Sequence, residues 1–395
     1  MKLLKKNHSL SALGVKHNNL NRNVVRDIIN KILIITLSLS TFMVFAEKKH
    51  PVKKNTIKVA LLLDTSNSMD GLINQAKTQL WEIVNELSYA KCDNENPDLE
   101  IALYEYGNDN LSSKEGYIRQ VIGFSSDLDE ISEKLFALKT NGGNEFCGEV
   151  ILTSLKQLDW GENKNNLKLL FIAGNEPFTQ GKINYKDAAT QANEQDVTIN
   201  TIFCGNYENG ISGKWQDGAR LTNGEYMTID HNEQIVHIVS PYDDIIIKLN
   251  NQLNSTYIYY GSNGRSKMRL QAVQDSNAAE LDEVVVVKRA VSKSSRVYKN
   301  ATWDLVDAEK EEGFSYSKLD KKTLPVDLQG KTSAEIKKYV SEQRKKRIEI
   351  QEKINDLNAK RNKYVAEKNK DNSKGLERVM VEAIKKQAKR KNYEW

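Results

Sequence analysis

The sequence predicts an α/β protein with a doubly wound, mostly parallel sheet, followed by an α-helical extension. Up to residue 229, short apolar runs alternate with segments whose apolar residues recur at helical spacing, which is the pattern of βαβ units. Beyond Pro241 the strand patterns stop and helical patterns continue. The composition has 39% hydrophobic and 28% charged residues, with 5 prolines in 395 residues. It fits a folded, helix-rich protein and excludes a disordered or multi-pass membrane chain.

Residues 1–46 are predicted to be a secretory signal peptide. Basic residues precede an apolar run at 32–45 that is too short to span a bilayer comfortably. Val44-Phe45-Ala46 resembles a small-x-small cleavage site and directly precedes Glu47. We therefore expect an exported protein, periplasmic or secreted, with residues 47–56 as a linker. A retained N-terminal anchor is the alternative.

The predicted α/β domain covers residues 57–240. Its first strand, 57–63, is a short apolar run interrupted only by Lys58, as expected for a parallel strand that is buried on both faces. The helix after it is indicated by apolar residues at helical spacing between Leu72 and Leu87. Further strands are predicted at 99–106, 117–124, 167–172, 197–203 and 226–229, and further helices at 127–138, 148–158 and 185–193.

The predicted extension covers residues 241–395. Helices are expected from Ile245 and over 265–291, although the run 284–287 is equally compatible with a strand. Thr332-Ser-Ala-Glu335 is a capping box. It begins a heptad-like helix over 332–368. The seam of that helix is formed by Ile336, Val340, Gln343, Arg347, Ile350, Ile354, Leu357, Arg361 and Tyr364.

One motif carries chemistry, Asp64-Thr65-Ser66-Asn67-Ser68, between the first strand and the first helix. Ligands of doubly wound sheets bind at the carboxyl ends of strands. A carboxylate and two hydroxyls spaced two residues apart can converge there on a hard cation such as Mg²⁺, which prefers oxygen ligands. The alternative is that Asp64 or Ser66 only caps the following helix.

The block from Leu61 to Met69, Leu-Leu-Leu-Asp-Thr-Ser-Asn-Ser-Met, resembles the first loop of the metal-ion-dependent adhesion site (MIDAS) of von Willebrand factor type A (VWA) domains. The resemblance continues over residues 57–229, including the closing stretch 218–229. It implies a Rossmann-like fold. It also implies that Asp64, Ser66 and Ser68 bind Mg²⁺, Mn²⁺ or Ca²⁺, and that an acidic side chain of a partner protein completes the coordination.

Two positions depart from the family pattern. Glu145 stands where the second loop usually has a threonine, and Gly174 stands where the third loop usually has an aspartate. We expect Glu145 to bind the metal directly, and Glu176 to bind it directly or through water. A second carboxylate makes the ion less attractive to a partner's carboxylate. The same variant loops resemble a group of exported bacterial VWA proteins.

Two of the three cysteines are candidates for a disulfide. Cys147 lies in the second loop and Cys204 ends a buried strand, so the fold is expected to bring both to the same rim of the sheet. An exported protein can keep a disulfide there. Two buried free thiols are the alternative, and Cys92 is left over.

Other chemistries find no support in the sequence. It has no zinc-ligand spacing of His and Cys, no phosphate-binding loop and no nucleophile turn. The net charge of +5 is too small to argue for nucleic acid. We therefore expect a non-enzymatic, metal-assisted protein-binding module. The alternative is an envelope scaffold acting through its basic helical extension, with peripheral contact to envelope polymers or lipid headgroups. The oligomeric state stays open.

Overall fold

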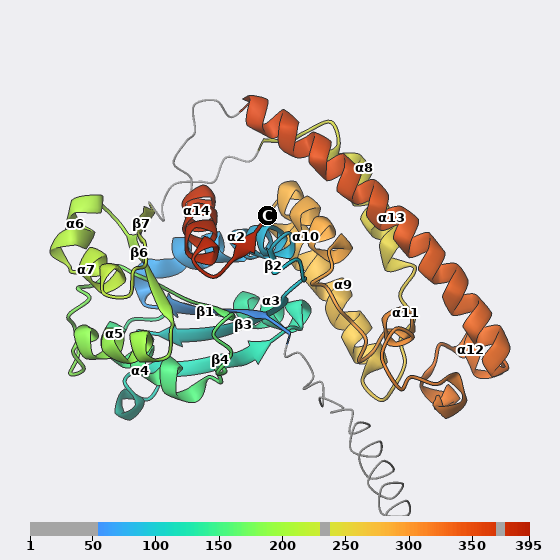
Figure 1. The fold of residues 1–395 in the computed structure, drawn as a ribbon, viewed down its shortest axis with the longest axis horizontal. Coiled ribbons are helices and arrows are strands. Elements are labelled where there is room, and N and C mark those ends of the chain that lie inside the picture. Colours follow the sequence, from blue (N-terminus) through green and yellow to red (C-terminus); the bar gives the residue numbers. More distant parts are fainter. Residues whose placement is uncertain (1–53, 230–237, 369–375) are drawn as a thin grey trace, which may run out of the picture. The chain divides into compact units, whose positions relative to one another are not determined.

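A computed structural model describes residues 54–229, 238–368 and 376–395 (Figure 1). Within it, Lys54–Trp395 form one compact unit. The predicted signal peptide, residues 1–46, lies outside the described residues. In the described part of the chain, no helix is long and apolar enough to cross a membrane.

The centre of the unit is a six-stranded sheet with the order β4-β3-β1-β5-β6-β7. Its strands are β1 (Thr56–Asp64), β3 (Asp98–Tyr106), β4 (Ile118–Ser125), β5 (Leu167–Gly174), β6 (Thr198–Cys204) and β7 (Tyr226–Ile229). Neighbouring strands are parallel except β3 and β4, which are antiparallel. The connection between these two, residues 107–117, is too short for a helical crossover. The predicted doubly wound, mostly parallel sheet is confirmed.

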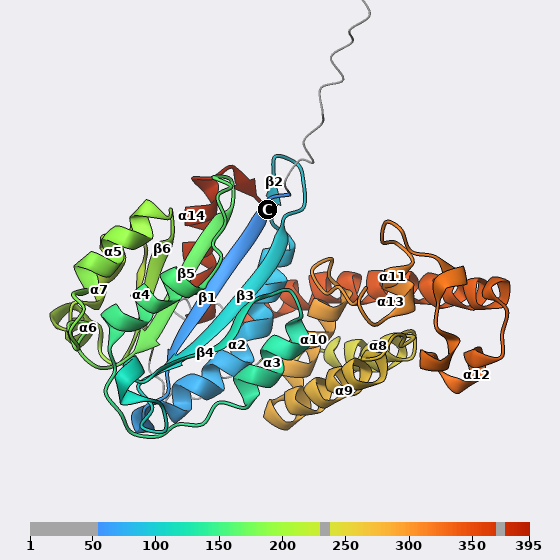
Figure 2. The same cartoon turned by 90° about the horizontal axis from the view of Figure 1, so that it is seen from below.

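Helices cover both faces of this sheet (Figure 2). Because side chains alternate along a strand, Ala60 and Leu62 of β1 pack toward one face, and Leu61 and Leu63 toward the other. The first face is covered by α4 (Cys147–Gln157), α5 (Tyr185–Glu194) and α7 (Trp215–Arg220). The second is covered by α2 (Asp70–Ser88) and α3 (Leu128–Phe136).

The helices between residues 238 and 368 are α8 (Asp243–Asn254), α9 (Gly264–Leu281), α10 (Glu283–Ser294), α11 (Leu305–Ala308), α12 (Val326–Gln329) and α13 (Ser333–Lys368). Of these, α10 packs against α2 and α9 packs against α3. The ambiguous run 284–287 is helical, and Asp282 caps α10 by accepting a hydrogen bond from Val284 N. Helix α10 lies against α2, where Ser292 Oγ donates to Asn85 Oδ1 at 2.6 Å.

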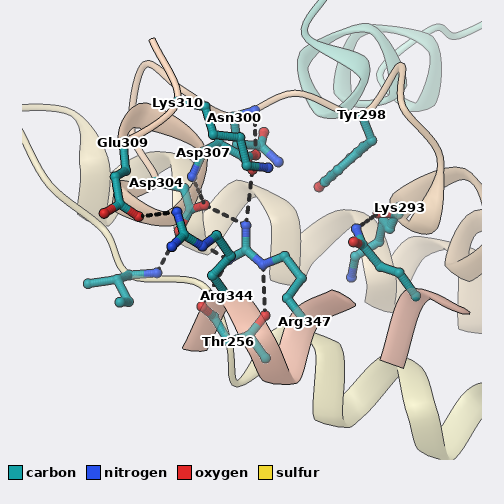
Figure 3. A network of polar contacts seen from close by, with 12 residues as sticks. Thr256, Lys293, Tyr298, Asn300, Asp304, Asp307, Glu309, Lys310, Arg344 and Arg347 are labelled. Carbon is teal, nitrogen blue, oxygen red and sulfur yellow. Dashed lines mark hydrogen bonds and ion pairs between the residues drawn. The ribbon is translucent and has the colours of Figure 1, made fainter. Parts of the chain in front are cut away.

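The capping box of α13 is confirmed. Thr332 N donates to Glu335 Oε2 at 2.8 Å, and Glu335 N donates to Thr332 Oγ1 at 3.3 Å. The predicted seam is largely the buried side of the helix, with Asn358 buried where Leu357 was expected. Its neighbours are α8, α10 and α11. The seam contains two buried arginines, Arg347, which Figure 3 shows with its polar partners, and Arg361.

The segment after α13 returns to the sheet. Helix α14 (Leu376–Lys389) contacts α2 and β7, and β8 (Tyr393–Glu394) pairs antiparallel with β2 (Lys91–Cys92). The side chains of Asn200 in β6 and Gln387 in α14 exchange two buried hydrogen bonds, at 3.1 and 2.6 Å. The predicted extension, 241–395, therefore ends in a segment that completes the cover of the α/β domain.

Candidate metal centre

Asp64 ends β1 and begins the loop that was predicted to bind metal. Its side chain is completely buried. Oδ1 accepts a hydrogen bond from Ser66 N at 2.7 Å, whereas Oδ2 is buried and has no hydrogen-bond partner among the described residues. Ser66 Oγ and Ser68 Oγ lie 3.3 Å apart. No side chain caps the short helix at Asn67–Met69 or the start of α2. The serine hydroxyls are therefore not used as helix caps.

Asn108 holds this loop in place from the end of β3. Its Nδ2 donates to Lys139 O at 2.9 Å and approaches Thr65 O at 3.4 Å. Asn141 N also donates to Thr65 O, at 2.9 Å. The loops that follow β1, β3 and α3 are thus tied together by backbone and amide hydrogen bonds. The sequence analysis did not single out Asn108, because a lone asparagine in a turn carries no motif.

Glu145, just before α4, lies beside Asp64. A Cβ atom on Gly107 would lie 2.6 Å from Glu145 Cγ and 2.8 Å from Asp64 Oδ1. The two acidic side chains thus flank a position that a glycine leaves open. Gly107 has φ +76°, a conformation that other residues rarely adopt. Glu145 N donates to Gln180 Oε1 at 2.9 Å, which fixes the backbone of this residue.

The acids of this loop cluster disfavour each other's ionisation. Burial raises the pKa of Asp64 to about 7; hydrogen bonds from Ser66 oppose this shift, and the charge of Glu176 adds to it. Burial raises the pKa of Glu145 to about 8, with contributions from the charges of Asp64 and Glu176. A hydrogen bond with the Ser66 side chain lowers that pKa in part. Negative charge at this edge of the sheet is therefore uncompensated within the chain.

The other buried carboxylates show how this protein normally compensates such charge. Each of four is paired with an arginine: Glu105 with Arg119, Asp129 with Arg289, Asp243 with Arg361 and Asp304 with Arg347. Of the buried acidic residues in the described ranges, Asp64 and Glu145 are the two without an ion pair. Burying an ionised carboxylate is costly unless a cation accompanies it. Among the described residues, no basic side chain supplies that cation to Asp64 or Glu145.

The third loop leaves no room for the aspartate that the family usually has at the position of Gly174. A Cβ on Gly174 would lie 2.5 Å from Tyr106 Oη and 3.1 Å from Asp64 Oδ2, so no aspartate fits there. Asn175 Nδ2 donates to Ser68 Oγ at 3.0 Å, and its Oδ1 is buried without a hydrogen-bond partner in the described structure. Glu176 is exposed. Its role as a ligand stays a prediction, and Asn175 is a contact that the sequence analysis missed.

The model of the von Willebrand factor type A domain family matches residues 58–214. This part of the chain is a VWA domain. The match spans β1 to the end of α6 (Tyr207–Ser212) and includes every loop of the candidate metal centre. It bears out the family resemblance that begins at the loop from Leu61 to Met69.

Solved structures resemble the chain at low identity. BatB, a conserved hypothetical protein from Bacteroides thetaiotaomicron, is 15% identical; the match covers 44% of this chain and 90% of that chain, with a TM-score of 0.34. The SpRpn10 VWA domain is 16% identical, with 46% and 91% coverage and a TM-score of 0.35. Proximal thread matrix protein 1 from the mussel byssus, solved with a zinc-occupied MIDAS motif, is 12% identical, with 46% and 43% coverage and a TM-score of 0.33. A comparison with curated proteins gave no match.

The residues of this VWA domain fit a hard divalent cation. The available atoms are all oxygens, from the carboxylates of Asp64 and Glu145 and the hydroxyls of Ser66 and Ser68. Mg²⁺, Mn²⁺ and Ca²⁺ accept such ligands, whereas thiolates and imidazoles suit softer metals. In the described ranges no three His, Cys, Asp or Glu side chains are grouped to hold a metal.

The predicted disulfide between Cys147 and Cys204 is absent. Both cysteines are buried free thiols, as is Cys92. Cys204 packs with Leu63 and Ala173 on one face of the VWA sheet, whereas Cys147 packs with the α4 cluster on the other face. Both residues do lie near Asp64, but the sheet separates them. The prediction was wrong because successive side chains of a strand point to opposite faces of the sheet, so two residues at the same rim can be on different faces.

Proposed function

We propose that the VWA domain binds Mg²⁺, Mn²⁺ or Ca²⁺ at Asp64, Ser66, Ser68 and Glu145 and uses the ion to hold a partner protein. VWA domains generally mediate protein–protein interactions and are generally not enzymes. The supporting observation is that Asp64 and Glu145 are buried next to each other and form no ion pair with a basic side chain in the described ranges. The other buried acids there are paired with arginines. A divalent ion supplies that charge.

The residues of the chain have separate tasks in this proposal. Asp64 offers its unpartnered Oδ2, and Glu145 adds a second carboxylate from the neighbouring loop. Ser66 and Ser68 offer hydroxyls, and Asn108 keeps their loop in register with the loops beside it. When bound, the ion supplies a Lewis-acidic position that an oxygen of a partner can fill.

We further propose that the protein acts outside the cytoplasm as a binding protein and catalyses no reaction. The signal-like segment 1–46 supports export. The alternative, a scaffold role for the helical extension, has weaker support. On the outer side of α13, exposed lysines such as Lys345 and Lys353 alternate with exposed acids such as Glu349 and Glu352. This pattern is typical of a solvated helix face.

Calorimetric titration of the full chain with Mg²⁺, Mn²⁺ and Ca²⁺ tests the metal. We expect one site per chain and a rise in melting temperature with metal, because the ion binds only the folded state. Asp64→Ala should abolish both, whereas Glu162→Ala, an exposed acid before β5, should change neither. Absence of binding heat in the wild type, or an unchanged response in Asp64→Ala, would contradict the proposal. A pull-down from an envelope fraction, with and without chelator, then tests whether partner capture depends on the metal.

A further inference from the structure

The charge balance at the metal centre bears on the partner. If Asp64 and Glu145 both bind the ion as carboxylates, their two negative charges cancel the two positive charges of the metal. A partner's carboxylate then gains little Coulomb energy from the ion and must still lose its hydration. A neutral oxygen, from a backbone carbonyl, an amide or a hydroxyl, loses less hydration energy on binding.

The carboxylate of Glu145 cannot move away from the ion and leave it with a net positive charge. The Glu145 side chain is buried, with its Cγ against Gly107 and its backbone N–H bound to Gln180. The third loop cannot provide a carboxylate in place of Glu145, because Tyr106 and Asp64 occupy the space that a side chain on Gly174 would need. The packing of the loops therefore fixes a net charge of zero for the ion together with its two carboxylates.

The rim of the centre adds further negative charge. Asp109 is exposed and lies close to the metal loop. A Cβ atom built on Gly142 would lie 3.5 Å from Asp109 Oδ2 and 3.4 Å from Nδ2 of Asn67, which belongs to that loop. Glu176 is exposed beside Asn175 and contributes to the electrostatic potential at Asp64 and Glu145. Neither Asp109 nor Glu176 forms an ion pair with any described residue, and Lys139 on the same loop as Gly142 pairs with neither. These carboxylates repel an acidic partner and attract a basic one.

We propose that the partner of this VWA domain presents a neutral oxygen donor flanked by basic side chains, and not a carboxylate. This inference depends on the proposed metal site and specifies its partner. Asp64 and Glu145 set the preference for a neutral ligand at the ion, and Asp109 and Glu176 set the preference for basic flanks. The carboxylate partner implied by the family resemblance is thereby replaced.

Three synthetic peptides of equal length test the inference on the full chain loaded with Mn²⁺. One alternates lysine and serine, one glutamate and serine, and one glycine and serine. Water-proton relaxation reports when a peptide oxygen displaces water from the ion. We expect the lysine–serine peptide to lower the water-proton relaxation rate at the lowest peptide concentration. The glycine–serine peptide should require a higher concentration, and the glutamate–serine peptide the highest.

Two sets of variants separate the two preferences. Glu145→Thr should reverse the order in favour of the glutamate–serine peptide, because the ion regains net positive charge. Asp109→Asn/Glu176→Gln should raise the concentration of lysine–serine peptide required by about fivefold. The matched control Glu162→Gln/Glu194→Gln removes two exposed charges elsewhere and should change nothing. The rim variants keep the test valid if Glu145→Thr does not fold.

The outcomes that would overturn the inference are distinct from failure of the metal site. A wild-type preference for the glutamate–serine peptide would overturn it, although the metal site would stand. Binding of the lysine–serine peptide without any change in relaxation would show that no partner oxygen reaches the ion, and would also overturn it. If Mn²⁺ itself does not bind, the proposed function fails before any peptide is added, and the inference falls with it.

Discussion

Single residues decide the chemistry of this VWA domain, and the most exacting of them is a glycine. Gly107 has a positive φ, and a methyl group there would meet both Glu145 and Asp64. We expect Gly107→Ala to cost about 1–3 kcal/mol of stability through backbone strain and, in addition, to weaken Mg²⁺ binding. Gly313 has φ +82° and open space around it, so Gly313→Ala should show the strain alone. Chemical unfolding and calorimetry measure the two effects. Equal metal affinity in both variants would contradict this placement of Glu145.

The ionisation of Asp64 gives a prediction about pH. Burial raises its pKa from 3.8 to about 7, so the folded metal-free protein binds a proton that the unfolded chain releases in that window. This contribution to stability is present below the unfolded pKa and is lost as the pH rises through the folded pKa. In chelator, the wild type should therefore lose stability relative to Asp64→Asn as the pH rises from about 4 to about 7.

Urea unfolding at several pH values measures that difference, and saturating Mg²⁺ should reduce it, because the ion then compensates the charge. Glu194→Gln, an exposed acid on α5, is the control and should keep a constant offset from the wild type. A constant offset for Asp64→Asn as well would show that the carboxylate is not held in an unfavourable environment.

At the scale of elements, helix α13 is attached to the rest of the unit by arginines. Arg347 Nη1 lies 2.6 Å from Asp304 Oδ2, and its Nε donates to Thr256 Oγ1 at 3.0 Å (Figure 3). Both members of the ion pair are buried. Arg344, one turn earlier, pairs with Glu309 at 2.7 Å but is partly exposed. The two arginines therefore test the effect of burial on otherwise similar contacts.

We expect Arg347→Ala to destabilise the protein by about 3–5 kcal/mol, because it leaves Asp304 buried without its cation. Arg344→Ala should cost less than about 1 kcal/mol, since Arg344 is partly exposed and solvent screens its ion pair. Denaturant unfolding of both variants measures the difference. Similar losses for the two would mean that Arg347 stabilises α13 by packing alone.

The elements that local patterns specify were predicted well. Strand β1 is mostly apolar because both faces of it are covered, and the α13 seam was found because its buried positions recur at heptad spacing. Two features of the sheet were not predicted. The antiparallel direction of β4 follows from the short connection at 107–117, and the separation of Cys147 from Cys204 follows from which face each packs on.

In the candidate site, the residues of the local motif were predicted, and two residues that join distant loops were not. The motif placed Asp64, Ser66 and Ser68 in one loop, where the two hydroxyls are adjacent. The contact of Glu145 with the space beside Asp64 agrees with the position expected for it. Asn108 and Asn175 were missed because their contacts join loops far apart in the sequence, and an amide side chain has no characteristic spacing.

At the scale of the whole molecule, the segment 376–395 closes the VWA domain from the other end of the chain. Met380, Ile384 and Ala388 of α14 are buried in the cluster that also contains α2. Tyr393 Oη donates to Asn165 O at 2.9 Å, just before β5. In the sequence, the helices α8 to α13 thus lie between two segments that both pack on the α/β domain.

Gln387 is the residue through which this closure is best tested. Gln387→Ala leaves the completely buried Asn200 without its amide partner, and we expect a loss of about 1–3 kcal/mol. Lys386→Ala removes an exposed ion pair with Glu225 and should have little effect. Deleting residues 376–395 should lower the melting temperature, and the corresponding peptide added in trans should raise it again. A deletion variant as stable as the full chain would contradict this account.

The pairing of β2 with β8 also has a consequence for biosynthesis. Lys91 and Cys92 leave the ribosome long before Tyr393 and Glu394, their partners in the two-stranded sheet. Until then the surface beneath α14 stays exposed, and so does the amide of Asn200. Nascent chains are therefore expected to remain open to chaperones and proteases until synthesis reaches this segment. Products that terminate early would display the uncovered surface and be degraded, so complete chains would be the ones that persist.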